Sequence, residues 1–90
     1  MKTKEALQKE WDKLGFSCNL WVDPPGQIWK GYVHEVDERV YVVEGKLEFE
    51  IVGKKYVLNP NDELLIPART KHSVKNIGSN TARWFYGYKI

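Results

Sequence analysis

The sequence predicts a small all-β domain with one short helix at its N-terminus. From residue 16 onward, apolar and polar residues alternate with the period of two that half-buried strands show. Clusters of Pro, Gly, Asn and Asp interrupt this alternation about every 6–12 residues, and 13% of the residues are aromatic. About eight short strands spaced in this way indicate a sandwich or a barrel, not a parallel sheet with crossover helices.

The N-terminal segment has the periodicity of a helix over residues 3–14. Thr3 can cap its N-terminus, and Gly15 can end it in the left-handed conformation. Its apolar stripe consists of Leu7, Trp11 and Leu14. A helix of about 12 residues is marginal alone, so this one should pack on the barrel or on a partner subunit. We therefore divide the chain into a helical segment, residues 1–15, and a β domain, residues 16–90.

The turn residues define the limits of the expected strands. These strands are Phe16–Val22, Gln27–His34, Arg39–Val43, Leu47–Ile51, Lys55–Leu58, Glu63–Ile66, His72–Ile77 and Ala82–Lys89. In the first strand the alternation predicts a buried face, which consists of Phe16, Cys18, Leu20 and Val22. In the second strand the same alternation would turn Lys30 inward. Lys30 therefore lies at the mouth of the barrel, or a bulge intervenes before Gly31.

Composition excludes several classes of protein. The 90 residues suffice for one small domain, and a net charge of +2 is too mild to indicate a nucleic-acid partner. No apolar run approaches the roughly 18 residues that a membrane span needs, and the N-terminus lacks the apolar core of a secretory signal. The single cysteine cannot form an internal disulfide. We expect a soluble cytoplasmic protein with no nucleic-acid or membrane partner.

Two groups of residues resemble the two sequence motifs of the cupins. In the first group, His34 is followed after three residues by Glu38 and after six more by Gly45, while Tyr32 holds the place of the family's first histidine. The second group matches the other motif with Pro67, His72 and Asn76 at the usual spacing. Arg69 stands where that motif usually has Gly.

The resemblance implies a fold more firmly than a function. It is to a single-domain cupin, a small jelly-roll barrel (double-stranded β-helix) covering about residues 16–90. Cupins include dioxygenases, isomerases, epimerases, sugar- or hormone-binding proteins and storage proteins, so the fold leaves the activity open.

The two histidines of the chain both fall in these motifs, and Glu38 completes a set of two nitrogen donors and one carboxylate. Such a set suits Fe(II), Mn(II), Ni(II) or Zn(II) with positions left open for a substrate. An unbroken strand would hold His34 and Glu38 about 13 Å apart, so the chain must turn between them. The alternative to a metal site is a hydrogen-bonded polar core without an ion.

Four further residues are candidates for contact with a ligand: Gln27, Tyr32, Arg69 and Asn76. Tyr32 is either a packing aromatic or a phenolate ligand. In similar cupins a polar side chain at the place of Gln27 often points into the pocket, but a solvated strand start is the alternative. Arg69 could pair with an anionic ligand or remain a solvated loop residue. On the last strand, Trp84, Tyr86 and Tyr88 share one face and form core or interface packing, or an aromatic platform for a ligand.

Two functional classes are consistent with these features. The first is a metal-dependent enzyme that acts on a small polar molecule, anionic ones included, inside the barrel. The second is a non-catalytic module that binds or senses a small ligand without metal. We also expect a homodimer, formed through the residues before Pro24 or through the aromatic strands, because a barrel this small exposes sheet edges.

Overall fold

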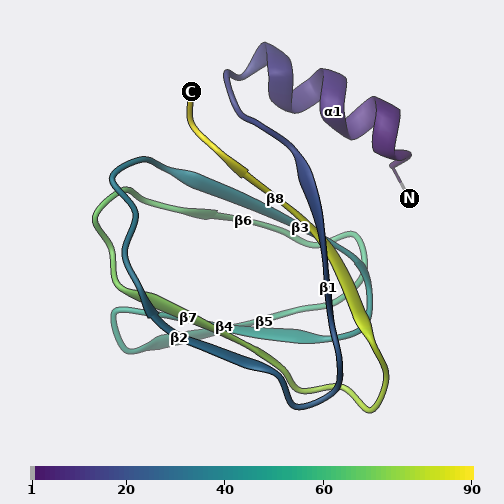
Figure 1. The fold of residues 1–90 in the computed structure, drawn as a ribbon, viewed down its shortest axis with the longest axis vertical. Helices are drawn as coiled ribbons and strands as arrows, with labels where there is room; N and C mark the ends of the chain where they lie inside the picture. Colours follow the sequence, from purple (N-terminus) through teal and green to yellow (C-terminus); the bar gives the residue numbers. More distant parts are fainter. Residues whose placement is uncertain (1) are drawn as a thin grey trace.

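The computed structural model describes residues 2–90, which form one helix followed by eight strands (Figure 1). The elements are α1 (Lys4–Lys13), β1 (Asn19–Asp23), β2 (Ile28–Tyr32), β3 (Glu38–Glu44), β4 (Leu47–Ile51), β5 (Lys54–Leu58), β6 (Glu63–Ile66), β7 (His72–Asn76) and β8 (Ala82–Tyr88). The prediction of an all-β domain with one N-terminal helix is confirmed. No helix within the described residues is long and apolar enough to cross a membrane.

The strands pair in the order of a jelly roll. Antiparallel pairs join β1 to β8, β2 to β7, β3 to β6 and β4 to β5, so the chain behaves as one long hairpin that is wound up. Winding places the strands in two four-stranded sheets, with the orders β1-β8-β3-β6 and β2-β7-β4-β5. Figure 1 shows these two sheets facing each other across the barrel. The predicted jelly-roll architecture is therefore confirmed.

The main core lies between the two sheets, because every second residue of the central strands points inward. On β3 and β8 the inward positions are cross-strand pairs such as Val40 with Tyr86 and Val42 with Trp84. The buried members of this core are Val40, Val42, Leu47, Phe49, Leu58, Ile66, Val74, Ala82 and Trp84. Burying each large apolar side chain of this set contributes about 1.5–3 kcal/mol.

A second core lies on the outer face of the first sheet, where α1 packs against it (Figure 1). Its buried members are Leu7, Trp11, Phe16, Tyr41 and Phe85, and the half-buried Cys18 packs against them. Thr3 caps the helix as expected, because its hydroxyl accepts a hydrogen bond from the amide of Ala6 at 3.1 Å. Leu14 does not join the apolar stripe, since it forms the C-terminal cap and remains 43% exposed.

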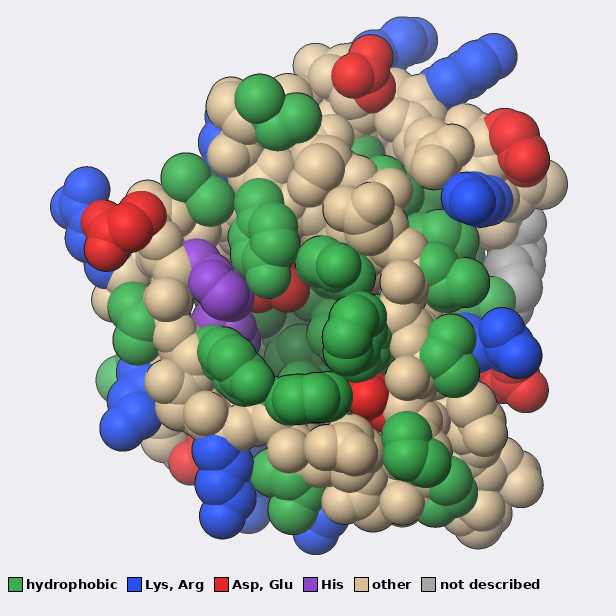
Figure 2. All heavy atoms as spheres, in the orientation of Figure 1, with side chains coloured by type: hydrophobic (Ala, Val, Ile, Leu, Met, Phe, Trp, Pro, Cys, Tyr) green, Lys and Arg blue, Asp and Glu red, His purple; other side chains and the backbone are tan. Residues whose placement is uncertain are grey.

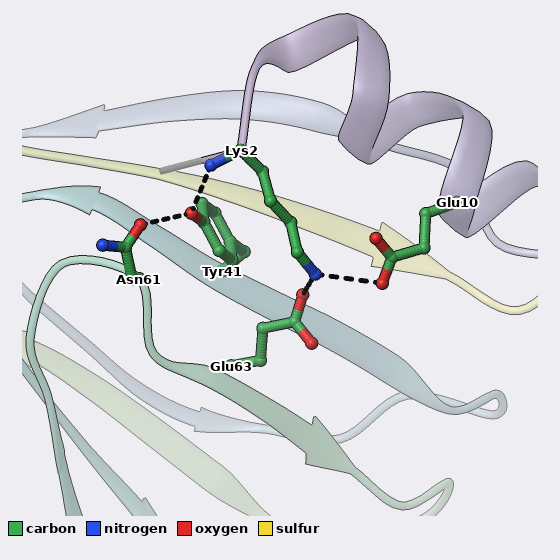
Figure 3. A network of polar contacts seen from close by, with 5 residues as sticks. All are labelled: Lys2, Glu10, Tyr41, Asn61 and Glu63. Atoms are coloured by element: carbon green, nitrogen blue, oxygen red, sulfur yellow. Dashed lines mark hydrogen bonds and ion pairs between the residues drawn. The ribbon is translucent and has the colours of Figure 1, made fainter.

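A polar network ties the start of the helix to the sheet (Figure 3). The Lys2 amide donates to the Tyr41 hydroxyl at 3.2 Å, and that hydroxyl donates to the Asn61 side-chain carbonyl at 2.6 Å. The Lys2 ammonium group contacts Glu10 at 3.0 Å and Glu63 at 3.2 Å. Exposed ion pairs such as these contribute little to stability. The apolar contacts of the second core therefore provide most of the free energy that keeps α1 on the sheet.

The predicted buried face of the first strand is wrong beyond Cys18. Leu20 and Val22 lie on the outer face of β1, past the end of the helix, and remain 43% and 44% exposed. The inward positions are Trp21 and Asp23, which lie opposite Trp84 and Ala82 of β8. The alternation is present in β1, but the side of the sheet that becomes buried depends on where α1 ends.

A bulge in β2 settles the orientation of Lys30. The register between β2 and β7 shifts between Trp29 and Tyr32, so both aromatic side chains point toward the barrel interior. Gly31 takes a left-handed conformation with φ of 70° inside the bulge. Lys30 is exposed on the outer face, which confirms the second of the two predicted alternatives.

One glycine permits the close packing of the helix on β8. A Cβ atom at Gly87 would overlap the Ser17 carbonyl and lie 2.9 Å from a ring carbon of Trp11. We expect Gly87→Ala to lower the free energy of unfolding by about 1–3 kcal/mol, the usual cost of overpacking. Urea unfolding monitored by circular dichroism measures this change. Gly78→Ala is the matched control, since its nearest neighbour lies at 3.4 Å, and equal losses in both variants would contradict the packing described.

Candidate metal centre

Three side chains from two separate parts of the sequence converge at one end of the barrel. Glu38 begins β3 in the first sheet, His72 begins β7 in the second sheet, and His34 lies in the loop between β2 and β3. One ligand atom from each lies within 4.8 Å of the others. Oε1 of Glu38 lies 3.5 Å from Nε2 of His34 and 3.3 Å from Nε2 of His72. The predicted convergence of this set is therefore observed.

Contacts between two loops place His34 beside Glu38. The chain bends through residues 35–36, so His34 and Glu38 do not lie on one straight strand. The carbonyl of His34 accepts a hydrogen bond from the Arg69 amide at 2.7 Å, and the Asp37 carboxylate accepts one from the Ala68 amide at 2.8 Å. The expected turn is present, and the loop before β7 holds it in place.

The hydrogen bonding of His72 directs its Nε2 toward the cluster. Its Nδ1 lies 3.0 Å from the Thr70 carbonyl, which can only accept, so Nδ1 carries the proton. Burial lowers the pKa of His72, but contact with the Glu38 carboxylate and the Thr70 carbonyl raises it by more. The net result is a pKa above the ordinary value of 6.5. A proton and a metal ion therefore compete for the same nitrogen.

Glu38 supplies a buried acceptor that the described residues leave unsatisfied. Its side chain is 6% exposed, and its Oε1 has no hydrogen-bond partner among residues 2–90, although both histidines lie within 3.5 Å. A buried carboxylate oxygen without a partner is costly, so a cation beside it would remove that cost. Two imidazole nitrogens and one carboxylate oxygen thus fit a divalent transition metal ion.

Two tyrosines border the cluster. The ring of Tyr32 is nearly parallel to that of His34, with centroids 6.3 Å apart, and lies 6.5 Å from the ring of His72. The Tyr88 hydroxyl lies 3.5 Å from Nε2 of His34. Burial and the negative charge of Glu38, with further contributions from neighbouring tyrosines, raise the pKa of Tyr88 to about 12. Tyr88 is therefore a neutral hydrogen-bond donor near neutral pH.

The cluster opens onto a cavity of about 240 Å³. The cavity is lined by Trp21, Trp29, Tyr32, His34, Glu38, Phe49, His72, Val74, Trp84, Tyr86 and Tyr88. Figure 2 shows its mouth, ringed by hydrophobic side chains, with the histidine side chains on one wall and acidic side chains deeper inside. On the aromatic face of β8, Trp84 and Tyr86 pack in the main core, as one of the predicted alternatives has it, and together with Tyr88 they also line the cavity. The histidine and carboxylate donors are confined to one wall.

Three of the predicted ligand-contacting residues lie outside this cavity. Asn76 is buried, and its amide group donates to the carbonyls of Asp23, Pro24 and Asn80. The Arg69 side chain is 77% exposed, with its Nε 3.5 Å from Glu35. Gln27 is half-buried, and its amide donates to the carbonyl of Ile28 at 3.4 Å. None of the three lines the cavity, so a ligand role for them stays a prediction; Tyr32 alone of the four candidates lines it.

Sequence reasoning missed Asp23, Trp21 and Trp29. The carboxylate of Asp23 is 2% exposed and accepts hydrogen bonds from three tryptophan indoles, although the sequence suggested only a turn residue. Trp21 and Asp23 lie two residues apart, so both point inward from β1. That spacing of a tryptophan and an aspartate was the signal in the sequence that could have indicated their contact. Trp29 faces inward only because of the bulge in β2.

Comparisons with known proteins agree with this geometry. A family model described as the cupin domain matches residues 19–88. A Streptomyces cyaneus protein named polyketide synthase CurC is 35% identical over 72 residues, which cover 80% of this chain and 47% of that protein. An uncharacterized protein of Archaeoglobus fulgidus is 36% identical over 53 residues, or 59% of this chain and 50% of that protein. The chain spans about half the length of these curated relatives.

Solved structures share the fold. The cupin domain of an XRE family transcriptional regulator from Enterobacter cloacae superposes with a TM-score of 0.77 at 23% identity, covering 88% of this chain and 85% of that one. The cupin domain of Schizosaccharomyces pombe Cnp3 superposes with a TM-score of 0.78 at 18% identity, covering 83% and 56%. With the family model matching most of the chain and the motif residues meeting in one barrel, the protein belongs to the cupin family.

Proposed function

We propose that this cupin binds one divalent transition metal ion through His34, Glu38 and His72, and holds a small oxygen-bearing molecule beside it in the cavity. The single observation that carries the proposal is the unsatisfied Oε1 of buried Glu38, which lies within 3.5 Å of both histidine nitrogens. The set of two nitrogens and one oxygen suits Fe(II), Mn(II), Ni(II) or Zn(II). An ion bound there supplies Lewis acidity toward a ligand oxygen.

The protein side chains have separate roles in this proposal. His34, His72 and Glu38 hold the ion, and the Thr70 carbonyl keeps the one proton of the neutral His72 ring on Nδ1, which leaves Nε2 for the ion. The neutral Tyr88 hydroxyl donates a hydrogen bond to a ligand oxygen near His34. The aromatic and apolar side chains that line the rest of the cavity offer few polar groups to water, which strengthens polar contacts made beside them.

The resulting activity is metal-dependent chemistry on that small molecule. The name of the polyketide synthase relative supports a polyketide-derived ligand.

The alternative is a metal-free module that binds or senses a ligand. The 3.3 Å contact between Glu38 and His72 favours it, because a protonated His72 would satisfy the carboxylate without an ion. Metal analysis of protein purified without added metal separates the two, since only the first requires a stoichiometric ion.

Two substitutions test the assignment of the ligands. We expect His72→Ala to weaken Zn(II) binding by about 100-fold or more, because it removes a nitrogen that contacts the ion. Tyr32→Phe should change the affinity by less than about threefold, since Tyr32 only borders the site. Calorimetric titration with Fe(II), Mn(II), Ni(II) and Zn(II) near pH 7.5 measures both, with circular dichroism as a check on folding. Equal affinities in wild type and His72→Ala would refute the site.

Metal affinity should also depend on pH in a defined direction. Binding requires unprotonated Nε2 of His72, whose pKa lies above 6.5 in the metal-free protein. The Zn(II) affinity should therefore be highest at high pH. As the pH falls, the affinity should begin to decline before pH 6.5 is reached, and it should fall by about tenfold per pH unit once His72 is protonated. Competition with a chelator of known affinity, repeated between about pH 8 and pH 6, measures the slope. An affinity that is constant over that range would count against His72 as a ligand.

Assembly is a separate part of the proposal. Leu20 and Val22 are exposed on the outer face of β1, which is an edge strand of its sheet, while the aromatic side chains of β8 face the cavity or the helix. Pairing of two copies along β1 would cover this apolar edge. Light scattering at tens of micromolar should give about 21 kDa, twice the 10.5 kDa chain. Leu20→Lys should shift the mass toward 10.5 kDa, and a wild type of 10.5 kDa would exclude the dimer.

A further inference from the structure

One buried carboxylate organises the aromatic wall of the cavity. Oδ1 of Asp23 accepts the indole N–H of Trp21 at 2.9 Å and that of Trp29 at 3.0 Å, and Oδ2 accepts that of Trp84 at 3.1 Å. These tryptophans come from β1, β2 and β8, so Asp23 links strands of both sheets. Three neutral donors meet its charge, and no ion pair to it is found among residues 2–90. We define the three tryptophans together with Asp23 as the indole clamp.

The clamp determines which part of each indole meets a ligand. All three rings line the cavity, and their only polar edges are occupied by Asp23, so the remaining ring surface is hydrocarbon. Trp21 lies nearly perpendicular to Trp29, at 71° and 5.9 Å, and to Tyr86, at 80° and 6.1 Å. Phe49 and Trp84 meet at 87° and 5.8 Å. Rings at these angles form the sides of a box rather than a flat stack.

Outside the proposed metal centre, the described residues that line the cavity offer no cationic side chain to an anionic ligand. Seven of its eleven lining residues are Trp, Tyr or Phe, and no Lys or Arg of the described chain lines it. Arg69 lies near Glu35 in the solvent, which corresponds to the solvated loop residue of the two alternatives considered for it. Outside the proposed metal centre, a carboxylate or phosphate group would meet Val74 and aromatic side chains, none of which carries a positive charge. The walls therefore suit an uncharged, flat group that stacks on and abuts aromatic rings.

The size of the cavity limits that group. A 150 Å³ apolar cavity accommodates benzene, and this one measures about 240 Å³. Two fused rings fill that space better than one. The donors of His34, Glu38 and His72 lie on a single wall, so only one edge of such a ligand would need oxygen atoms.

We propose that the cavity selects a flat, uncharged aromatic ligand of about two fused rings with adjacent oxygen atoms on one edge. Asp23 is the positioning residue that fixes the three indoles against it. The orientation of the oxygens rests on the proposed metal function, whereas recognition of the rings by the indole clamp does not. An organic cation is the competing occupant, because aromatic boxes also bind quaternary ammonium groups. A divalent ion in the same cavity would repel such a cation.

Three probes distinguish these ligand classes by isothermal titration calorimetry, on protein with and without bound Zn(II). The probes are 2,3-dihydroxynaphthalene, which has flat rings and adjacent oxygens; trans-1,2-cyclohexanediol, which has only the oxygens; and tetramethylammonium chloride. We expect the naphthalene probe to bind at least about tenfold more tightly than the other two in both forms. Comparable binding of the cyclohexane diol, or tighter binding of tetramethylammonium, would overturn the proposal.

Substitution of Asp23 tests the clamp itself. Asp23→Asn replaces one acceptor oxygen with an amide that faces an indole N–H, so the indoles lose their fixed positions. We expect at least about a tenfold loss of affinity for 2,3-dihydroxynaphthalene and a change in the near-ultraviolet circular dichroism of the tryptophans. The Zn(II) affinity should stay within about threefold of wild type. Asp12→Asn, on the exposed face of α1, is the matched control and should leave all three readouts unchanged.

A second variant keeps the test decisive if Asp23→Asn does not fold. Trp29→Leu removes one wall of the box and leaves Asp23 with two donors, and it should produce the same selective loss of the naphthalene probe. Wild-type affinity for that probe in a folded Asp23→Asn or Trp29→Leu variant would refute the clamp. If wild type binds no Zn(II) but binds the probe in a manner dependent on Asp23, the metal function fails and the inference stands. If Zn(II) binds and the probe does not, the inference fails and the metal function stands.

Discussion

Burial of the Glu38 carboxylate is the constraint on which this end of the barrel depends. Glu38 opens β3, the strand that pairs with both β6 and β8, so its side chain is fixed by the sheet and cannot move out to solvent. A carboxylate held in that position needs cationic or donor partners. The bend at residues 35–36 brings His34, and the start of β7 brings His72. The loops around the site are therefore organised around a charge that the sheet places inside the protein.

Two buried carboxylates are satisfied in different ways: Glu38, which lines the cavity, and Asp23, which binds three of its tryptophans. Asp23 accepts three indole hydrogen bonds, and both of its oxygens have partners. Glu38 lies close to two histidines, yet its Oε1 has no hydrogen bond within residues 2–90. A satisfied carboxylate stabilises the wall around it, while an unsatisfied one between two imidazoles is suited to receive an ion. The tryptophans held by Asp23 would therefore contact the rings of a ligand, whereas the metal centre at Glu38 would act on its oxygen atoms.

Sequence patterns predicted the fold and the convergence of His34, Glu38 and His72, because the spacing within each of the two motifs is kept in the barrel. The distances along the chain between His34, Glu38 and Gly45 survive in the structure as a loop, a strand start and a left-handed turn with φ of 94°. The inward face of β1 could not be predicted, because the end of α1 decides which apolar residues are covered. Trp29 was missed since a bulge changed its parity. Arg69 adopts φ of 57°, the left-handed conformation for which the usual glycine of the motif is suited, so its backbone fits the family while its side chain faces solvent.

The central claim is that His34, Glu38 and His72 hold one metal ion. Anomalous diffraction at the zinc absorption edge, from crystals grown with Zn(II), tests it most directly. The structure predicts one strong peak at about 2.0–2.2 Å from Nε2 of His34, Nε2 of His72 and Oε1 of Glu38. A peak elsewhere on the surface with none between these three atoms would contradict the claim, and the contact between Glu38 and His72 would then be an ion pair that needs no metal.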